Sequence, residues 1–429
     1  MIINKLIFVI ILLLLSTSNC IEVYAMSFND KHITVEEMNA NPSILNNKRI
    51  EQVHLEGLHL KNAIISNLVM KDVNAMNGIF ENITFENCTF IKVRFDDGNF
   101  NNVSFKKCKF IPIDESKKYD TMTTFNDASF NKVIFDSSDF KYVDFGVING
   151  NNGFILFKNI TNAIPRGRTF FSVENAQVRV ADSSIDGLIA GDENVHAITK
   201  NSQFTKYAGI YCDNNFIINT KMQESDVSAF KVLVIRDSVV DAAVGINGGK
   251  AYLTNNTYLH GTITLLNGET ETLGVGLHAK PDDSIYIVAK DREPCAFSIF
   301  GGTVTLKGFT LDEHTRIGSL LKEKPPITAI NLKDVTIQGG NWKGLRLLGG
   351  QWENVRIEPP VLVDRTSIKN LRYYRLDFPK GPPWNKKGEF VIEATENQTP
   401  FVWEEPKIPT PEDLGMVWWP EVEPGYHGQ

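Results

Sequence analysis

Residues 83–107 read Ile-Thr-Phe-Glu-Asn, Cys-Thr-Phe-Ile-Lys, Val-Arg-Phe-Asp-Asp, Gly-Asn-Phe-Asn-Asn and Val-Ser-Phe-Lys-Lys. A phenylalanine thus recurs at every fifth position, and the same frame holds Phe80, Phe85, Phe90, Phe95, Phe100, Phe105, Phe110, Phe125, Phe130, Phe135, Phe140 and Phe145. A period of five fits neither an α-helix, which repeats every 3.6 residues, nor a flat strand, which repeats every two. It predicts a chain that turns a corner every five residues and sends one bulky side chain inward from each facet.

The frame extends upstream with other apolar residues, and a smaller residue stands two positions before each centre. The upstream centres are Ile50, Leu55, Leu60, Ile65, Met70 and Ala75. The smaller residues include Val53, Leu58, Ile83, Cys88, Val93, Val103 and Cys108, while the other three positions are mostly polar. This binary pattern predicts two buried side chains per facet.

The pattern resembles the pentapeptide repeat family over about residues 50–145. The resemblance implies a right-handed quadrilateral β-helix with four facets and about twenty residues per coil. It implies no activity, because members of that family have many roles.

A coil of about twenty residues predicts four columns of stacked side chains. They are Ile65-Phe85-Phe105-Phe125-Phe145, Met70-Phe90-Phe110-Phe130, Leu55-Ala75-Phe95-Glu115-Phe135 and Leu60-Phe80-Phe100-Asp120-Phe140. Glu115 and Asp120 break two columns, since a buried carboxylate without a partner costs several kcal/mol. Residues 111–121 are therefore expected to form a loop or two degenerate facets, and Pro112 with the charged run after it favours the loop.

The cysteines give a further prediction about side chains that stack from coil to coil. Cys88 and Cys108 both occupy the small inward position, one coil apart, and are expected to stack as two buried thiols. A disulfide between them is the alternative. Cys212 and Cys295 are expected to be buried and unpaired. The wide spacings give no zinc pattern, and we predict no metal site and no cofactor.

The start of the chain has the features of a secretory signal over residues 1–25. Lys5 precedes an apolar run over 6–15, and 23–25 (Val-Tyr-Ala) offers a cleavage site. The run is too short to cross a bilayer comfortably, although a retained anchor and a lipid on Cys20 remain alternatives. We expect an exported chain without a membrane span after cleavage, located in the periplasm, on the cell surface or outside the cell.

The rest of the chain divides into a cap, a second β-rich domain and a tail. Residues 26–49 contain Thr34-Val-Glu-Glu37, a capping box that predicts a short helix over the open end of the 50–148 repeat domain. Residues 149–377 alternate short β-rich runs with Asn, Asp and Gly turns. They predict a less regular right-handed parallel β-helix with coils of about 20–30 residues, or else a separate β-sandwich. The fold class is therefore all-β.

Residues 378–429 carry nine of the eighteen prolines and four of the six tryptophans: Trp384, Trp403, Trp418 and Trp419. Proline excludes a helix or a central strand, and tryptophan argues against disorder. We expect an extended tail packed along the β-helix. The alternative is an aromatic arm that contacts a protein or glycan partner through these tryptophans.

No catalytic set is assembled by the sequence. Candidate acids are Asp282-Asp283 and Asp312-Glu313, with His260 and His314 nearby. The polygalacturonase-type Asn-Thr-Asp is replaced by 219–221 (Asn-Thr-Lys). A carbohydrate-active enzyme, lyase or hydrolase-like, stays open because two carboxylates suffice for glycoside hydrolysis.

The charge disfavours a nucleic-acid partner. The net charge is −7, and 50–145 contains 14 Asp and Glu against 11 Lys and Arg, which is too mixed for a DNA-mimic topoisomerase inhibitor. The leading hypothesis is an exported, non-enzymatic β-solenoid that serves as a structural or binding scaffold for a protein or glycan.

Overall fold

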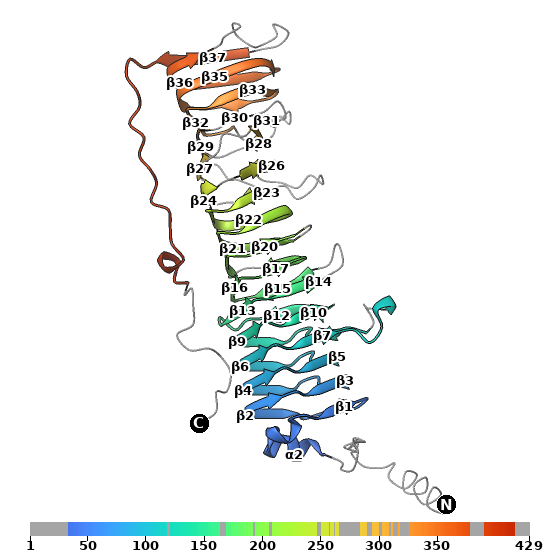
Figure 1. The fold of residues 1–429 in the computed structure, drawn as a ribbon. Coiled ribbons are helices and arrows are strands. Elements are labelled where there is room, and N and C mark those ends of the chain that lie inside the picture. The colour runs from blue at the N-terminus through green and yellow to red at the C-terminus, as the bar shows by residue number, and fades with distance from the viewer. Residues whose placement is uncertain are drawn as a thin grey trace, which may run out of the picture.

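The computed structural model shows one parallel β-solenoid with a short helix at its lower end (Figure 1). The predicted all-β class, helical cap and extended tail are confirmed. The structure describes these residues: 33–117, 121–141, 143–163, 169–191, 194–205, 208–246, 250–256, 258–260, 262–265, 284–289, 294–299, 303–308, 310–311, 316–317, 326–377 and 390–416.

Helix α2 (Val35–Ala40) covers the first coil, and the 3₁₀ turn η1 (Pro42–Leu45) follows it. The predicted capping box is present: the Glu37 amide donates to Thr34 Oγ1 at 3.2 Å, and the Thr34 amide donates to Glu37 Oε2 at 3.0 Å. Met38 and Leu45 are buried against the apolar interior of the solenoid. The cap thus shields an end that would otherwise expose apolar side chains.

The strands stack in parallel, each pairing with strands of the neighbouring coils. The first coils contain β1 Arg49–Glu51, β2 His59–Ser66, β3 Val69–Asn74, β4 Ile79–Glu86, β5 Thr89–Arg94, β6 Asn99–Lys106, β7 Lys109–Ile111, β8 Thr123–Thr124, β9 Ser129–Asp136, β10 Asp139–Lys141 and β11 Val143–Asp144. The next contain β12 Val147–Asn149, β13 Phe154–Lys158, β14 Thr161–Ala163, β15 Thr169–Glu174, β16 Gln177–Ala181, β17 Ser184–Ile185, β18 Leu188–Gly191, β19 His196–Lys200, β20 Gln203–Phe204, β21 Gly209–Ile218, β22 Lys221–Arg236, β23 Val239–Ile246, β24 Lys250–Asn256, β25 Tyr258–His260 and β26 Thr262–Leu265. The last contain β27 Ser284–Ala289, β28 Pro294–Ile299, β29 Thr303–Lys307, β30 Thr310–Leu311, β31 Arg316–Ile317, β32 Ala329–Lys333, β33 Thr336–Asn341, β34 Arg346–Leu347, β35 Gly350–Leu362, β36 Thr366–Asp377 and β37 Phe390–Glu396.

The corners of the repeat domain explain its richness in asparagine. The residue two after nearly every centre has a positive φ, which is 50° at Asn62, 56° at Asn67 and 52° at Asp72. This left-handed conformation is tolerated best by glycine, asparagine and aspartate among common residues. The asparagine side chains also bond from coil to coil, as from Asn67 Nδ2 to Asn47 Oδ1 at 2.8 Å. A left-handed corner every five residues was not part of the sequence prediction.

The predicted phenylalanine columns are correct below the 111–121 segment and wrong across it, while the predicted stacking of Phe125 on Phe145 above it is confirmed at 5.3 Å. Phe80 stacks on Phe100 with ring centroids 4.6 Å apart, as expected. Phe105, however, stacks on Phe135 at 4.9 Å and not on Phe125. The neighbouring columns shift in the same way: Phe95 on Phe125, Phe110 on Phe140, and Phe100 paired with Phe130.

The cause of the shift is that residues 111–121 add no facet to the coil. Glu115–Lys117 forms the 3₁₀ turn η2, and Glu115 is exposed, so the loop alternative is correct and the degenerate facets are wrong. Partners across this coil are 30 residues apart, as in the bond from Asn131 to Asn101, against 20 for Asn82 and Asn62. Asp120 lies outside the described residues.

The described residues between 149 and 377 continue the same solenoid, and the β-sandwich alternative is wrong. Corner partners here are 23 residues apart at Asn159, 19 at Asn201 and 18 at Asn219. The inward column Ile155, Val178, Ala197, Asn215, Leu233 and Ala251 passes through β13, β16, β19, β21, β22 and β24 without interruption.

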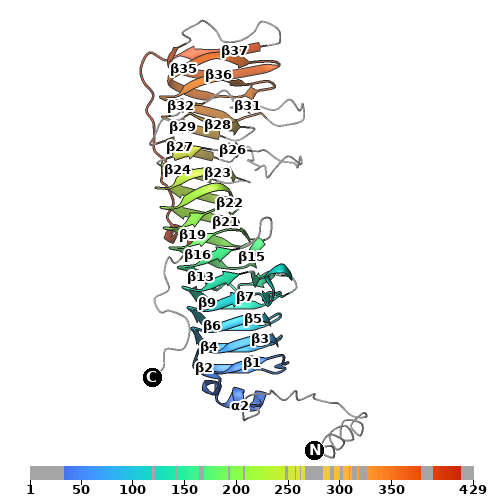
Figure 2. The ribbon, with the colours of Figure 1, turned by 45° about the vertical axis from the view of Figure 1, so that its right-hand side comes forward.

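The tail forms the last strand and then returns along one flank. β37 pairs in parallel with β36, and residues 397–416, here called the strap, run back beside the stack towards its lower coils (Figures 1 and 2). Ile408, Leu414 and Met416 pack against the outer face of β19, β21, β22 and β24. The strap therefore joins the top coil to coils far below it.

Candidate functional site

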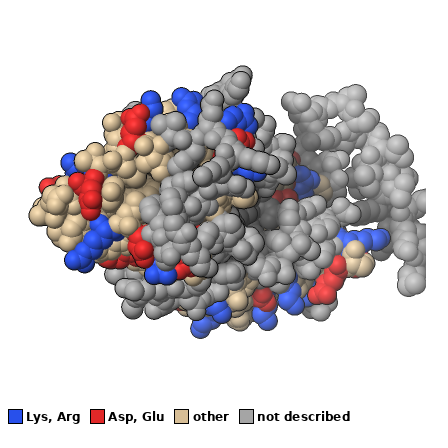
Figure 3. Space-filling model, turned by 90° about the horizontal axis from the view of Figure 1, so that it is seen from above, with Lys and Arg blue, Asp and Glu red and all other residues tan. Residues whose placement is uncertain are grey.

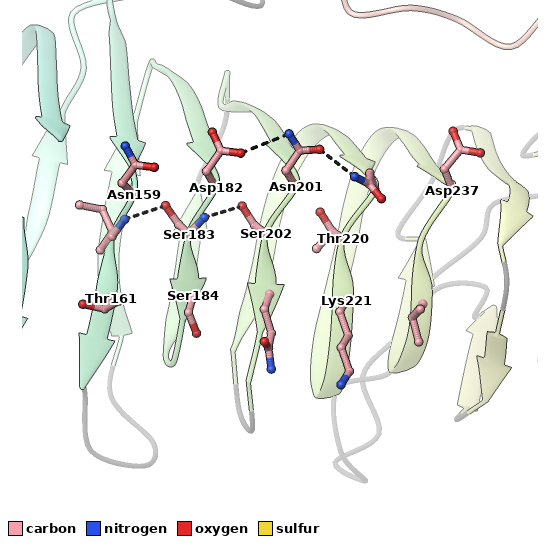
Figure 4. Close-up of a pocket in the computed structure, with 14 residues that line it drawn as sticks. Asn159, Thr161, Asp182, Ser183, Ser184, Asn201, Ser202, Thr220, Lys221 and Asp237 are labelled. Carbon is pink, nitrogen blue, oxygen red and sulfur yellow. Dashed lines mark hydrogen bonds between the residues drawn. The ribbon is translucent and has the colours of Figure 1, made fainter. Parts of the chain in front are cut away.

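An open groove of about 660 Å³ crosses β14, β17, β20, β22 and β23 on one flank. Figure 4 shows that its lining forms parallel rows of side chains, one from each coil. We call this feature the groove and its rows the corner row, the floor and the strand row.

The corner row consists of residues in the left-handed conformation: Asn159, Asp182, Asn201, Asn219 and Asp237. Asn201 Nδ2 donates to Asp182 Oδ1 at 3.2 Å, and Asn219 Nδ2 donates to Asn201 Oδ1 at 2.8 Å. These side chains are held upright in a hydrogen-bonded ladder, and Asp182, Asn201, Asn219 and Asp237 are exposed.

The floor consists of Ile160, Ser183, Ser202 and Thr220, and the hydroxyls of the last three form hydrogen bonds with the backbone. Ser183 Oγ donates to the Ala181 carbonyl at 2.6 Å and accepts from the Ile160 amide at 3.0 Å. Ser202 Oγ and Thr220 Oγ1 also donate to the carbonyl two residues earlier. The hydroxyls fix the backbone, and none of these three is poised as a nucleophile.

The strand row consists of Thr161, Ser184, Gln203 and Lys221, which pair in register along successive strands. Thr161 and Lys221 are exposed, and Ser184 and Gln203 are half-buried. Successive coils, about 4.8 Å apart, therefore offer different polar pairs along the groove: Asn159 with Thr161, Asp182 with Ser184, Asn201 with Gln203, and Asn219 with Lys221.

The sequence signal for this site is a recurring pair, Asn or Asp followed by Ser or Thr. It stands at 182–183, 201–202, 219–220 and 237–238. The first residue supplies the left-handed corner, and the second supplies the hydroxyl that ties the turn. We considered Asn219-Thr220 only as part of a catalytic motif that lacks its aspartate, and therefore did not predict the corner row.

Cys88 and Cys108 lie in the same vertical column as the floor residues of the groove. The column continues upward through Ser138 to Ile160 and Ser183. Cys88 Sγ lies 3.3 Å from the Ile65 carbonyl, and Cys108 Sγ lies 3.4 Å from the Phe85 carbonyl. The Cys108 amide donates to Ser138 Oγ, the next member of the column, at 3.1 Å. Both cysteines are buried free thiols in the structure, and burial raises the pKa of the Cys108 thiol well above its usual value. The thiols take the place of the serine hydroxyls.

This equivalence gives a stability prediction. We expect Cys108→Ser to change the free energy of unfolding by less than about 1 kcal/mol, because a hydroxyl serves the same column at Ser138. Cys108→Leu should cost about 1–3 kcal/mol, because the close-packed interior has no room for the larger side chain. Denaturant titration of the two variants checks the order, and equal losses would contradict it.

Of the predicted contact tryptophans, only Trp403 lies among the described residues; Trp384, Trp418 and Trp419 lie outside them. Trp403 is half-buried, and its Nε1 donates to Glu353 Oε2 at 2.9 Å. The Phe401 amide donates to the same oxygen at 2.8 Å, and Lys333 Nζ lies 3.5 Å from Glu353 Oε1. Trp403 thus anchors the strap to β35.

The remaining predicted residues do not assemble with the groove. Asp282-Asp283, Asp312-Glu313 and His314 lie outside the described residues, and His260 ends β25. Cys212 is a buried free thiol whose pKa is raised by burial, and Cys295 lies in β28.

Two carboxylates do line the groove, but their spacing is unsuited to glycoside hydrolysis. Asp182 and Asp237 are separated by the coils of Asn201 and Asn219, which places them about 14 Å apart at the strand spacing. Hydrolases need two carboxyl groups about 5–9.5 Å apart.

Among the residues that the structure describes, no cluster of three metal-ligating side chains occurs, and no helix is long and apolar enough to span a membrane.

Comparisons of this chain with protein-family models, with curated proteins and with solved structures find no match. The β-solenoid with a phenylalanine at every fifth residue is consistent with pentapeptide repeats.

Proposed function

We propose that this protein is an exported, non-enzymatic β-solenoid that binds a glycan in the groove. The observation that carries the proposal is the groove's corner row, in which an exposed amide or carboxylate side chain repeats coil after coil on a rigid backbone. A polymer with a regular array of hydroxyl groups can form the same hydrogen bonds at successive coils. Export follows from the signal-like residues 1–25.

The lining favours a glycan over a protein partner. Protein interfaces concentrate tyrosine, tryptophan, methionine and arginine at their centre and are depleted in serine and aspartate. The groove lining contains none of those enriched residues and is made mostly of Asn, Asp, Ser and Thr.

Basic and acidic side chains of the described residues are interspersed in the view from above (Figure 3), so no single charge sign dominates there.

The test is a binding measurement on one coil of the groove. The double variant Asn201→Ala with Gln203→Ala should weaken glycan binding about thirtyfold, since two hydrogen bonds of about 1 kcal/mol each are removed. Binding is measured on a panel of immobilised neutral and acidic oligosaccharides with the mature chain.

The matched control is Asn87→Ala with Thr89→Ala, which occupies the same positions of a coil outside the groove and should bind as the wild type does. Equal loss in both variants, or no oligosaccharide bound by the wild type, would contradict the proposal. Release of shortened sugars would instead favour the carbohydrate-active enzyme.

A further inference from the structure

The strap lies over a column of apolar side chains that point outward from the sheet. The column contains Ile198, Phe216, Val234 and Tyr252, on β19, β21, β22 and β24. None is more than 6% exposed, because Ile408, Leu414 and Met416 pack on them. Outward side chains of a sheet are buried only where something covers them.

The same outward column continues below the last described residue of the strap. The strand register places Arg179, Leu156, Ile134, Ser104 and Thr84 beneath Ile198 in that order. Their exposed fractions are 2%, 1%, 3%, 0% and 4%, although they point away from the interior. The burial seen beneath the strap thus extends over five more coils.

Arg179 indicates the chemistry of what covers this part of the column. Its Nη2 donates to Gln177 Oε1 at 3.0 Å, and its guanidinium lies 4.6 Å from the centroid of the Phe154 ring. Nε and Nη1 are buried and have no hydrogen-bond partner among the described residues, and burial lowers the pKa of Arg179 to about 10. A desolvated guanidinium without a carboxylate is best stabilised by aromatic faces, and indole is the strongest of these.

We propose that Trp418 and Trp419 continue the strap and pack over Arg179 and Leu156. Met416 sits against the cluster that contains Ile198, and the strap runs towards the lower coils. Arg179 and Leu156 are one and two strands below Ile198, or about 5 and 10 Å. Two to three extended residues span about 7–10 Å, so the next tryptophans in the sequence match the distance.

The apolar side chains around Leu156 are also suited to being covered by tryptophan. Ile134, Leu156 and Ala181 form a separate buried cluster outside the core, with Phe154 packed on its edge. An indole buries a large apolar area, which such a cluster requires. Trp418 and Trp419 would then close this flank and would not form a free arm for a partner. This inference does not depend on the groove.

Cross-linking in the full mature chain tests the placement. Leu156→Cys is combined with Trp418→Cys in one variant and with Trp419→Cys in another, and mild oxidation should form an intrachain disulfide in at least one. The control pairs Leu156→Cys with Val402→Cys, which is 91% exposed at the start of the strap and should not cross-link. Disulfide dimers would show that a second copy covers the column, and no bond in either variant would overturn the proposal.

Labelling gives a second readout that does not need a disulfide. With Leu156→Cys alone, maleimide labelling should be slow, because Leu156 is buried and the described native cysteines are buried too. Adding Trp418→Ser and Trp419→Ser should speed labelling at least about tenfold by uncovering the site. An unchanged rate would show that another group covers Leu156.

Discussion

Replacing Phe105 by alanine is expected to lower the free energy of unfolding by about 3–5 kcal/mol. The ring is fully buried and stacks between Phe85 at 5.1 Å and Phe135 at 4.9 Å. Each coil is closed around its phenylalanines, so the backbone cannot collapse into the space that the ring leaves, and the cavity term adds to the lost burial. Denaturant unfolding followed by circular dichroism measures the loss.

The matched control is Phe230→Ala, at an outward position of β22 where the ring is 38% exposed. It removes the same atoms but leaves no closed cavity, and should cost less than about 1 kcal/mol. Similar losses for Phe105→Ala and Phe230→Ala would mean that stacking in the column adds nothing beyond ordinary apolar contact.

The phenylalanine period was enough to predict the coil, because a side chain that recurs at every corner leaves the backbone little choice. The register above Phe110 could not be predicted in the same way. Residues 111–121 keep the five-residue frame, so the frame alone does not distinguish two facets from one loop. That depends on whether Glu115 and Asp120 can be buried. A loop over 111–121 implies that partners on its two sides are 30 residues apart and not 20. The predicted columns kept the spacing of 20 across the loop and were therefore wrong there.

The groove could be predicted only in part. Its pairs at 182–183, 201–202, 219–220 and 237–238 are spaced by 18 or 19 residues, too irregularly to stand out beside the strict repeat. The contact between Glu353 and Trp403 could not be predicted at all. Its partners are 50 residues apart, and the strap obeys no periodic rule that would set its position along the flank.

Glu353→Ala is expected to release the upper strap, at a cost of about 3–5 kcal/mol to its docking. Glu353 is 5% exposed, and one of its oxygens accepts from both the Phe401 amide and Trp403 Nε1. Alanine leaves the buried Phe401 amide, the half-buried Trp403 Nε1 and the half-buried Lys333 ammonium without this acceptor, so staying docked becomes unfavourable. Hydrogen exchange at the Phe401 amide should accelerate at least about a hundredfold.

The control Glu358→Ala lies on the same strand, β35, where the Glu358 side chain is 36% exposed and pairs with the exposed Arg356. Exposed ion pairs contribute about 0–1 kcal/mol, so exchange at Phe401 should stay within a few-fold of the wild type. Limited trypsin digestion at Lys407 gives an independent readout, since cleavage there needs the strap to leave the flank. If both variants protect Phe401 equally, the strap is held by its apolar contacts at Ile408, Leu414 and Met416, and the carboxylate only orients Trp403.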